Sequence, residues 1–217
     1  MTHAEVVEPG LRERKKLQTR RQIAETARRL FGERGFEHVT VAEIARTADV
    51  AEKTVFNYFP TKEDLVFWRL EAFEDELLGA IRDRAPGEPA LAAFGRFVRA
   101  RRGLLAEEDP EARKRLAAIT RMITESPALL RREQQIFDDY TASLAALLAE
   151  ETGAAAGDVE PRVAATAMMG VHRALVDFTR RRVVAGAPSA RIQRDVEAQA
   201  DRALALLDEG LGRYAVR

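Results

Sequence analysis

The stretch that decides the fold is residues 40–65, TVAEIARTADVAEKTVFNYFPTKEDL. Thr40 stands three positions before Glu43, a capping-box pattern that predicts the start of a helix of about two turns. A second short helix is expected over about residues 51–59, because Pro60 disfavours helical geometry in the residue before it. The stretch therefore predicts two short helices joined by a turn of about three or four residues.

The second of these helices is predicted to have one apolar and one polar face. At about 100° per residue, Val55, Phe56 and Phe59 gather on the side that we expect to pack against the preceding helices. Such packing is required because a helix of this length is unstable alone. The other side carries the polar residues, which are Lys53, Asn57 and Thr54, with Tyr58 on its flank.

These polar residues are of the kinds that recognise DNA. Lys53 suits guanine acceptors, Asn57 can bond adenine through its amide, and Thr54 can touch a thymine methyl group or donate to a phosphate. Glu52 can accept a hydrogen bond from a cytosine amine or simply favour the helix dipole. The pattern predicts a helix-turn-helix whose second helix enters the DNA major groove. For Lys53 and Asn57, the alternative is ordinary exposed surface.

Further residues are expected to meet the DNA backbone. Tyr58 points its hydroxyl toward a phosphate. Lys62 follows Pro60 at the next helix start, where an ammonium group and backbone amides both favour phosphate. Residues 12–21 hold six basic residues and one acidic residue, a cluster that suits a polyanion or, alternatively, forms a solvated helix start.

The region around this motif resembles the N-terminal domain of the tetracycline-repressor (TetR) family. ETARRLFGERGFEHV precedes the stretch quoted above, and the shared pattern is LF-x-x-x-G-F, then T-V-x-x-I-A, then T-V-F-x-Y-F-x-x-K-x-x-L. The resemblance covers about residues 15–66. It implies an all-α, homodimeric transcriptional regulator, usually a repressor, that binds a DNA operator. It also implies a C-terminal domain that binds a small molecule and then releases the DNA.

The resemblance also implies which residues touch DNA, carried over by position. The residues placed at bases or backbone are Thr40, Glu52, Lys53, Thr54, Asn57, Tyr58 and Lys62. Thr40 is also a plain helix cap, and we expect both roles. Two residues depart from the family pattern. Asp49 stands where Gly is usual, and Asp tolerates left-handed geometry at some strain; Ala51 replaces the usual Ser cap, which forfeits about 1 kcal/mol.

Composition argues against several other classes of protein. Cys is absent, which excludes disulfides, a thiol nucleophile and a Cys-ligated zinc site. The three His residues are far apart in sequence and form no catalytic or metal-binding motif. Charge-free runs reach only about ten residues, against roughly 20 needed to span a bilayer. We therefore expect a cytoplasmic protein that is not an enzyme, needs no cofactor or metal, and lacks an export signal.

Helical periodicity continues through the remainder of the chain. The sequence predicts an all-α protein with a helix-turn-helix domain over residues 12–60 and a ligand-binding and dimerisation domain over residues 61–217. About nine helices are expected: the two short ones, and residues 14–34, 61–84, 90–106, 111–123, 127–151, 160–185 and 189–213.

The last two helices have apolar stripes suited to a four-helix dimer interface, although each stripe could equally be core within one chain. Ile192, Ala200 and Leu204 represent the final helix, and Val163 and Gly170 its predecessor. A site for a hydrophobic or amphipathic effector is predicted from the apolar and aromatic residues between helices. Its candidate residues are Phe97, Met122, Phe137, Tyr140, Met168 and His172. Ordinary core is the alternative for each of them, and a ligand-independent DNA-binding protein or an activator is the alternative function.

Overall fold

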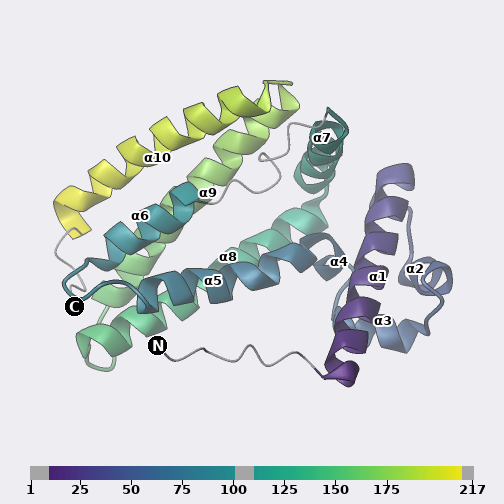
Figure 1. Ribbon diagram of the computed structural model, residues 1–217, viewed down its shortest axis with the longest axis horizontal. Coiled ribbons are helices and arrows are strands. Elements are labelled where there is room, and N and C mark those ends of the chain that lie inside the picture. Colours follow the sequence, from purple (N-terminus) through teal and green to yellow (C-terminus); the bar gives the residue numbers. More distant parts are fainter. Residues whose placement is uncertain (1–9, 101–109, 212–217) are drawn as a thin grey trace, which may run out of the picture. The chain divides into compact units, whose positions relative to one another are not determined.

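The computed structural model is all-α and describes residues 10–100 and 110–211 (Figure 1). These residues form ten α-helices and one short 3-10 helix, with no β-strand among them. The elements are α1 (Leu11–Arg34), α2 (Val41–Thr47), α3 (Glu52–Tyr58), α4 (Asp64–Phe67), η1 (Trp68–Leu70), α5 (Glu71–Arg82), α6 (Ala90–Ala100), α7 (Pro110–Glu125), α8 (Pro127–Thr152), α9 (Glu160–Val184) and α10 (Ser189–Leu211). The parts of two expected helices at residues 101–106 and 212–213 lie outside the described residues.

The chain forms two compact units, Met1–Trp68 and Arg69–Arg217. The expected single helix over residues 61–84 is instead α4, η1 and α5, which raises the number of α-helices from nine to ten. The reason is that this segment serves two cores. α4 packs against α1 and buries Leu65, whereas α5 packs against α6 and α8 and buries Phe73. The chain passes from one unit to the other within η1.

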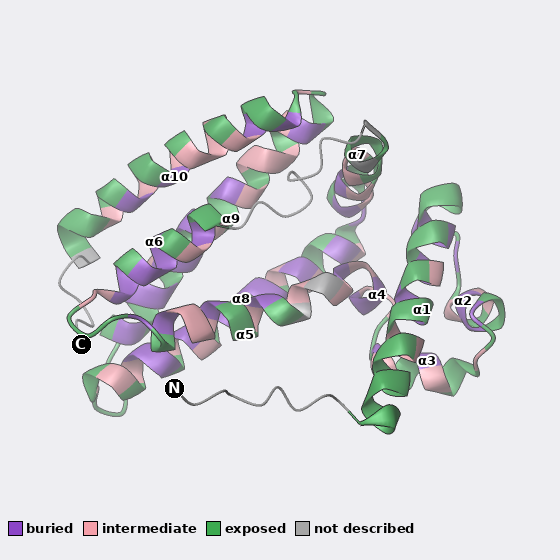
Figure 2. Ribbon diagram, viewed as in Figure 1, coloured by how far each residue is buried: buried purple, intermediate pink, exposed green. Residues whose placement is uncertain are grey.

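The N-terminal unit is built around the apolar face of α1 (Figure 2). α2 packs against α1 and α3, so that each short helix is held by a neighbour. The fully or nearly buried side chains of this core are Ile23, Ala27, Leu30, Phe31, Ile44, Val55, Phe59 and Leu65. Val41 is only half-buried because it occupies the first turn of α2.

Local sequence explains how α2 and α3 begin. The predicted capping box is present, because the Thr40 hydroxyl accepts from the Glu43 amide and the Glu43 carboxylate accepts from the Thr40 amide. Asp49 occupies the left-handed region with φ 53°, as its place in the turn predicts. Ala51 is the N-cap of α3 and makes no side-chain cap hydrogen bond.

The C-terminal unit is a layered set of helices in which α9 packs against α8 and α10, and α10 packs against α6 (Figure 1). Ile192, Ala200 and Leu204 of α10 are buried within the chain, so this stripe is intramolecular core. α8 and α9 are also joined by an ion pair between Glu133 and Arg180. Because these partners are both largely buried, each satisfies a charge that would otherwise be costly.

The uncapped start of α3 yields a prediction about stability. Ala51 has the extended geometry of an N-cap, φ −73° and ψ 148°, so a serine there can accept from an orphan amide without moving the backbone. We expect Ala51→Ser to stabilise the N-terminal unit by about 1 kcal/mol. Urea unfolding followed by fluorescence of Trp68, the sole tryptophan, measures this. Ala51→Val is the control, since it offers no acceptor; equal stability of the two variants would contradict the prediction.

Candidate nucleic-acid interface

The helix α3 has a buried side and an exposed side. Val55 is 1% exposed and Phe59 is fully buried. Glu52, Lys53 and Asn57 are exposed, and the remaining polar pair, Thr54 and Tyr58, is half-buried. The structure therefore leaves Lys53 and Asn57 together on the exposed side of α3, with Glu52 exposed and Thr54 half-buried on either side of them.

Phe56 corrects the sequence prediction. It was expected to pack inward, but it is 47% exposed. The reason is geometric: Val55 and Phe59, four residues apart, already occupy the buried side of α3. Phe56 lies about 60° around the helix from both Phe59 and Lys53, at the border between the two sides. Sequence reasoning thus missed one exposed aromatic residue on the polar face, although its angular position was the available signal.

Two contacts from α1 hold the turn and the end of α3 in place. The Gln22 Nε2 donates to the Ala48 carbonyl at 2.9 Å, which fixes the turn between α2 and α3. The Arg20 guanidinium lies 5.1 Å from the centre of the Phe59 ring. Because a cation over an aromatic face is attracted by the ring quadrupole, this contact ties Phe59, the C-cap residue of α3, to α1.

Lys62 rests on an aromatic surface. Its ammonium nitrogen is 4.1 Å from the centre of the Phe36 ring and 5.9 Å from that of Phe31. Burial lowers the pKa of Lys62 from its ordinary value, while Glu37, Glu63 and Glu43 act in the opposite direction. The rings hold the ammonium group at a defined place near the start of α4.

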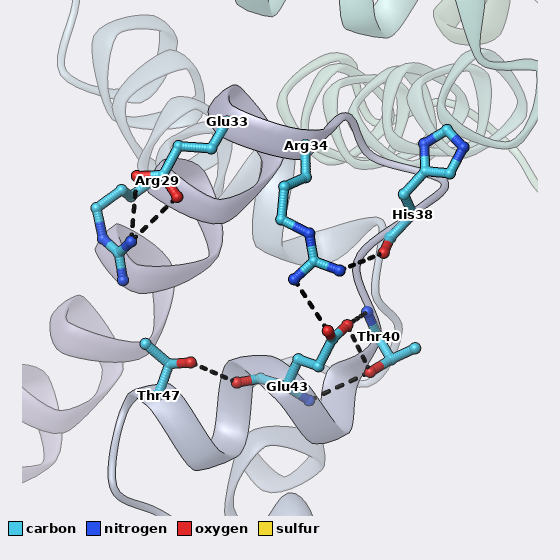
Figure 3. Close-up of polar contacts among 7 residues, drawn as sticks. All are labelled: Arg29, Glu33, Arg34, His38, Thr40, Glu43 and Thr47. Atoms are coloured by element: carbon cyan, nitrogen blue, oxygen red, sulfur yellow. Dashed lines mark hydrogen bonds and ion pairs between the residues drawn. The ribbon is translucent and has the colours of Figure 1, made fainter.

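A polar network joins the end of α1 to the start of α2 (Figure 3). The Thr40 hydroxyl donates to Glu43 Oε2 at 3.0 Å and accepts from the Glu43 amide at 3.2 Å. Arg34 donates to Glu43 Oε1 at 2.9 Å and to the His38 carbonyl at 3.1 Å. Because the Thr40 hydroxyl hydrogen is donated to Glu43, the hydroxyl has only a lone pair left. A phosphate oxygen, however, needs a donor.

The same network explains the acidity of Glu43. The backbone N–H of Thr40 and then the Arg34 guanidinium lower the pKa of Glu43 from 4.5 to about 2. Since the folded-state pKa is depressed, the stabilising contribution of this carboxylate is present above pH 4.5 and is lost as the pH falls toward about 2. At neutral pH, Glu43 is an anion at the edge of the candidate interface.

In the C-terminal unit, four predicted effector residues gather around one that was not predicted. The Phe73 ring stacks on His172 at 4.6 Å and on Tyr140 at 5.1 Å, and it meets Phe97 edge-on at 5.4 Å. Phe137 lies 5.6 Å from His172. Phe73 was not among the predicted effector residues, although it falls within the domain predicted over residues 61–217. These five residues are called the aromatic cluster below.

The other predicted effector residues and the polar edge of the cluster are also placed. Met168 is fully buried, and Met122 is half-buried on α7. The Tyr140 hydroxyl donates to the Leu70 carbonyl at 2.5 Å. Leu70 is the last residue of η1, so this bond attaches the aromatic cluster to the segment in which the two units join.

Comparison with known families accounts for both units. Residues 23–67 match the model for bacterial regulatory proteins of the tetR family. Residues 88–212, more than half of the chain, match the MftR C-terminal domain. The chain belongs to the TetR family of bacterial regulatory proteins. The resemblance seen in residues 15–66 is thereby confirmed and extended to the C-terminal unit.

Curated relatives agree with this membership of the TetR family. The chain is 31% identical over 147 residues to the HTH-type transcriptional regulator TcmR of Streptomyces glaucescens, covering 67% of this chain and 65% of TcmR. The match thus spans just under two thirds of that relative. The chain is also 27% identical over 165 residues to the transcriptional regulator MftR of Mycobacterium tuberculosis, covering 73% of this chain and 78% of MftR.

Solved structures show the same fold. GusR of Salmonella enterica superimposes with a TM-score of 0.52 at 22% identity, covering 90% of this chain and 96% of GusR. At this identity the likeness concerns the fold alone. Across residues 10–100 and 110–211, no helix is both long and apolar enough to cross a membrane.

Proposed function

We propose that this protein is a dimeric, one-component transcriptional regulator, most simply a repressor, that leaves its DNA operator when a hydrophobic or amphipathic molecule binds. The observation that carries the proposal is the two-sided α3, with Val55 and Phe59 buried and Lys53 and Asn57 exposed. An exposed polar face on a short, tightly anchored helix fits the major groove. Membership of the TetR family supports this function.

Base recognition is assigned to the exposed face of α3. Lys53 reaches guanine acceptors, Asn57 pairs with adenine, and Glu52 and Thr54 flank them. Phe56 joins this face, because an exposed ring beside Lys53 can contact the methyl group of thymine. Five neighbouring side chains of different chemistry give one helix enough contacts to distinguish a short sequence.

Backbone binding is assigned to residues around α3. Lys62 supplies a positioned cation, and Tyr58 supplies a hydroxyl at the helix flank. Thr40 can donate to a phosphate only when its hydroxyl hydrogen turns away from Glu43 and toward the phosphate oxygen. The basic residues of α1 from Arg12 to Arg21 add attraction that is independent of DNA sequence, because most of their side chains are exposed.

Selection of a duplex from a random-sequence library by the wild-type protein tests DNA binding. We expect Asn57→Ala to lose discrimination against base changes at one position of the selected site, by about 1–3 kcal/mol per base pair. Lys62→Met keeps an apolar side chain on Phe36 but removes the charge. It should weaken binding to all sequences and lower the slope of log K against log salt by about 0.9.

Each variant is the control for the other. If Lys62→Met leaves the slope unchanged, Lys62 does not neutralise a phosphate. If Asn57→Ala keeps full discrimination at every position, α3 is not the reading helix. A wild-type protein that selects no common sequence would remove the proposed function.

The dimer interface is assigned to the exposed side of α9. Val163 is 58% exposed, and Gly170 and Ala174, seven and eleven residues further on, are exposed on the same side. A Cβ added at Gly170 would have nothing within 4 Å. Small side chains let a second helix approach closely, and a two-fold axis would then pair α9 with itself. Two reading helices would thereby reach two half-sites of a palindromic operator.

Gly170→Arg tests the dimer. A single chain has room for the new side chain, and removing a glycine from a helix interior should stabilise it by about 0.8–1 kcal/mol. Across a dimer interface the same arginine would clash. Analytical ultracentrifugation at micromolar concentration should give a monomer for Gly170→Arg and a dimer for Gly79→Arg, a matched change at another open helical glycine. A monomeric wild type, or a dimeric Gly170→Arg, would contradict this interface.

The effector site is assigned to the aromatic cluster. It brings aromatic side chains together with the Tyr140 hydroxyl and the His172 ring as polar groups, and this mixture is the usual lining of a small-molecule site. An effector that inserts against Phe73 and takes the hydroxyl of Tyr140 breaks its bond to Leu70. η1 is then released from the C-terminal unit, and the population shifts toward a state with weaker operator binding.

Tyr140→Phe tests this coupling, because it keeps the ring and removes only the hydroxyl. A thermal-shift screen of lipophilic compounds on the wild type should find one that also lowers affinity for the selected duplex. In Tyr140→Phe the compound should still bind. The factor by which the compound lowers operator affinity should, however, be about fivefold smaller than in the wild type, which corresponds to one net hydrogen bond. A full response would exclude Tyr140 as the link. A screen without such a compound would favour a ligand-independent DNA-binding protein.

A further inference from the structure

Glu43 poses an electrostatic problem for DNA binding. It lies at the third position of the helix start that begins with Thr40, a residue assigned above to the DNA backbone. An ionised carboxylate near a phosphate repels it, and it also competes for nearby cations. Its electrostatic interaction extends to Lys62, the proposed phosphate contact. Something must neutralise Glu43 for this edge of the interface to accept a polyanion.

Arg34 is in the position to do so. It is the last residue of α1, and one of its terminal nitrogens donates to Glu43 while the other donates to the His38 carbonyl (Figure 3). The Arg34 side chain is 46% exposed and the Glu43 side chain only 23%. The guanidinium therefore covers one oxygen of the carboxylate, while the other oxygen is occupied by Thr40.

We infer that Arg34 is a positioning residue for DNA binding that acts through Glu43: it neutralises the carboxylate and holds the loop of His38 beside the start of α2. Arg34 directs two of its five N–H donors to partners within the protein, and its proposed effect on DNA runs through Glu43 rather than through a phosphate contact of its own. The inference rests on the proposed function, and it assigns a role that is independent of base recognition by α3.

Glutamate at this position serves the capping box rather than DNA. Its Oε2 accepts from the Thr40 amide at 2.8 Å, and this needs an oxygen acceptor but not a charge. Glutamine can take the same place in a capping box. Glu43→Gln therefore separates the cap from the charge, and it makes the role of Arg34 measurable.

The test is a double-mutant cycle on the duplex selected by the wild-type protein. Arg34→Ala should weaken binding about tenfold, because it leaves Glu43 uncompensated beside the phosphates and free to attract Lys62. Glu43→Gln should bind at least as tightly as the wild type. The double variant Arg34→Ala/Glu43→Gln should return to within about threefold of the wild type, since the charge that Arg34 neutralised is gone.

Arg29→Ala is the matched control. Arg29 is an exposed cation on the same helix and pairs with Glu33 at 3.2 Å, away from α2 (Figure 3). Its removal should change operator affinity by less than about twofold, since exposed pairs of this kind contribute little. Thermal unfolding of every variant shows whether the fold has been altered.

Three results would overturn the role of Arg34. If the double variant binds as weakly as Arg34→Ala and its salt slope falls by about 0.9, Arg34 contacts a phosphate directly. If Arg34→Ala and the double variant both unfold at a clearly lower temperature than the wild type, and Glu43→Gln restores neither the unfolding temperature nor the operator affinity, Arg34 is a structural clamp. If Arg34→Ala binds like Arg29→Ala, Glu43 does not oppose DNA binding. A wild type that selects no duplex would instead refute the proposed function itself.

Discussion

The burial of Val55 and Phe59 against the N-terminal core is the interaction on which the site depends. α3 has only seven residues, and a helix of that length does not persist in water without tertiary contacts. Its polar face is therefore displayed only while its apolar face is buried. Gln22 and Arg20 of α1 add two polar constraints, one at the turn before α3 and one at its end. α1 thus contacts the chain on both sides of α3.

Positive charge around α3 is fixed by two different physical means. Lys62 lies over the Phe36 ring, so its direction is set by an aromatic surface, while Glu37, Glu63 and Glu43 act on its charge from nearby. Arg34 is set by a carboxylate and a backbone carbonyl, so its charge is paired with that of Glu43. In the proposed interface, these two cations act differently on a polyanion. Lys62 contacts it, whereas Arg34 cancels the repulsion by Glu43.

In the proposed function, the segment from Asp64 to Arg82 links DNA binding to the effector site, because it belongs to both units. α4 completes the core around α1, and α5 completes the core around α8. The change of helical geometry at η1 lies between them, and Tyr140 bonds its last residue from within the aromatic cluster. A single hydrogen bond at a junction is a suitable point of control. It is weak enough to be exchanged for a ligand contact, yet it lies where the chain connects the two units.

The sequence by itself determined those features that depend on neighbours along the chain. The capping box at Thr40, the left-handed Asp49 and the all-α class follow from local hydrogen bonding, backbone sterics and periodicity. The tertiary structure alone decided whether a residue at the border between the two sides of a helix is exposed. It also decided where a long helical segment divides into separate helices. Phe56 is exposed because Val55 and Phe59 occupy the buried side of α3. The aromatic cluster forms because Phe73 meets Tyr140 and His172, which lie about 65 to 100 positions away in the sequence. Such outcomes depend on space shared between distant segments, which no local pattern records.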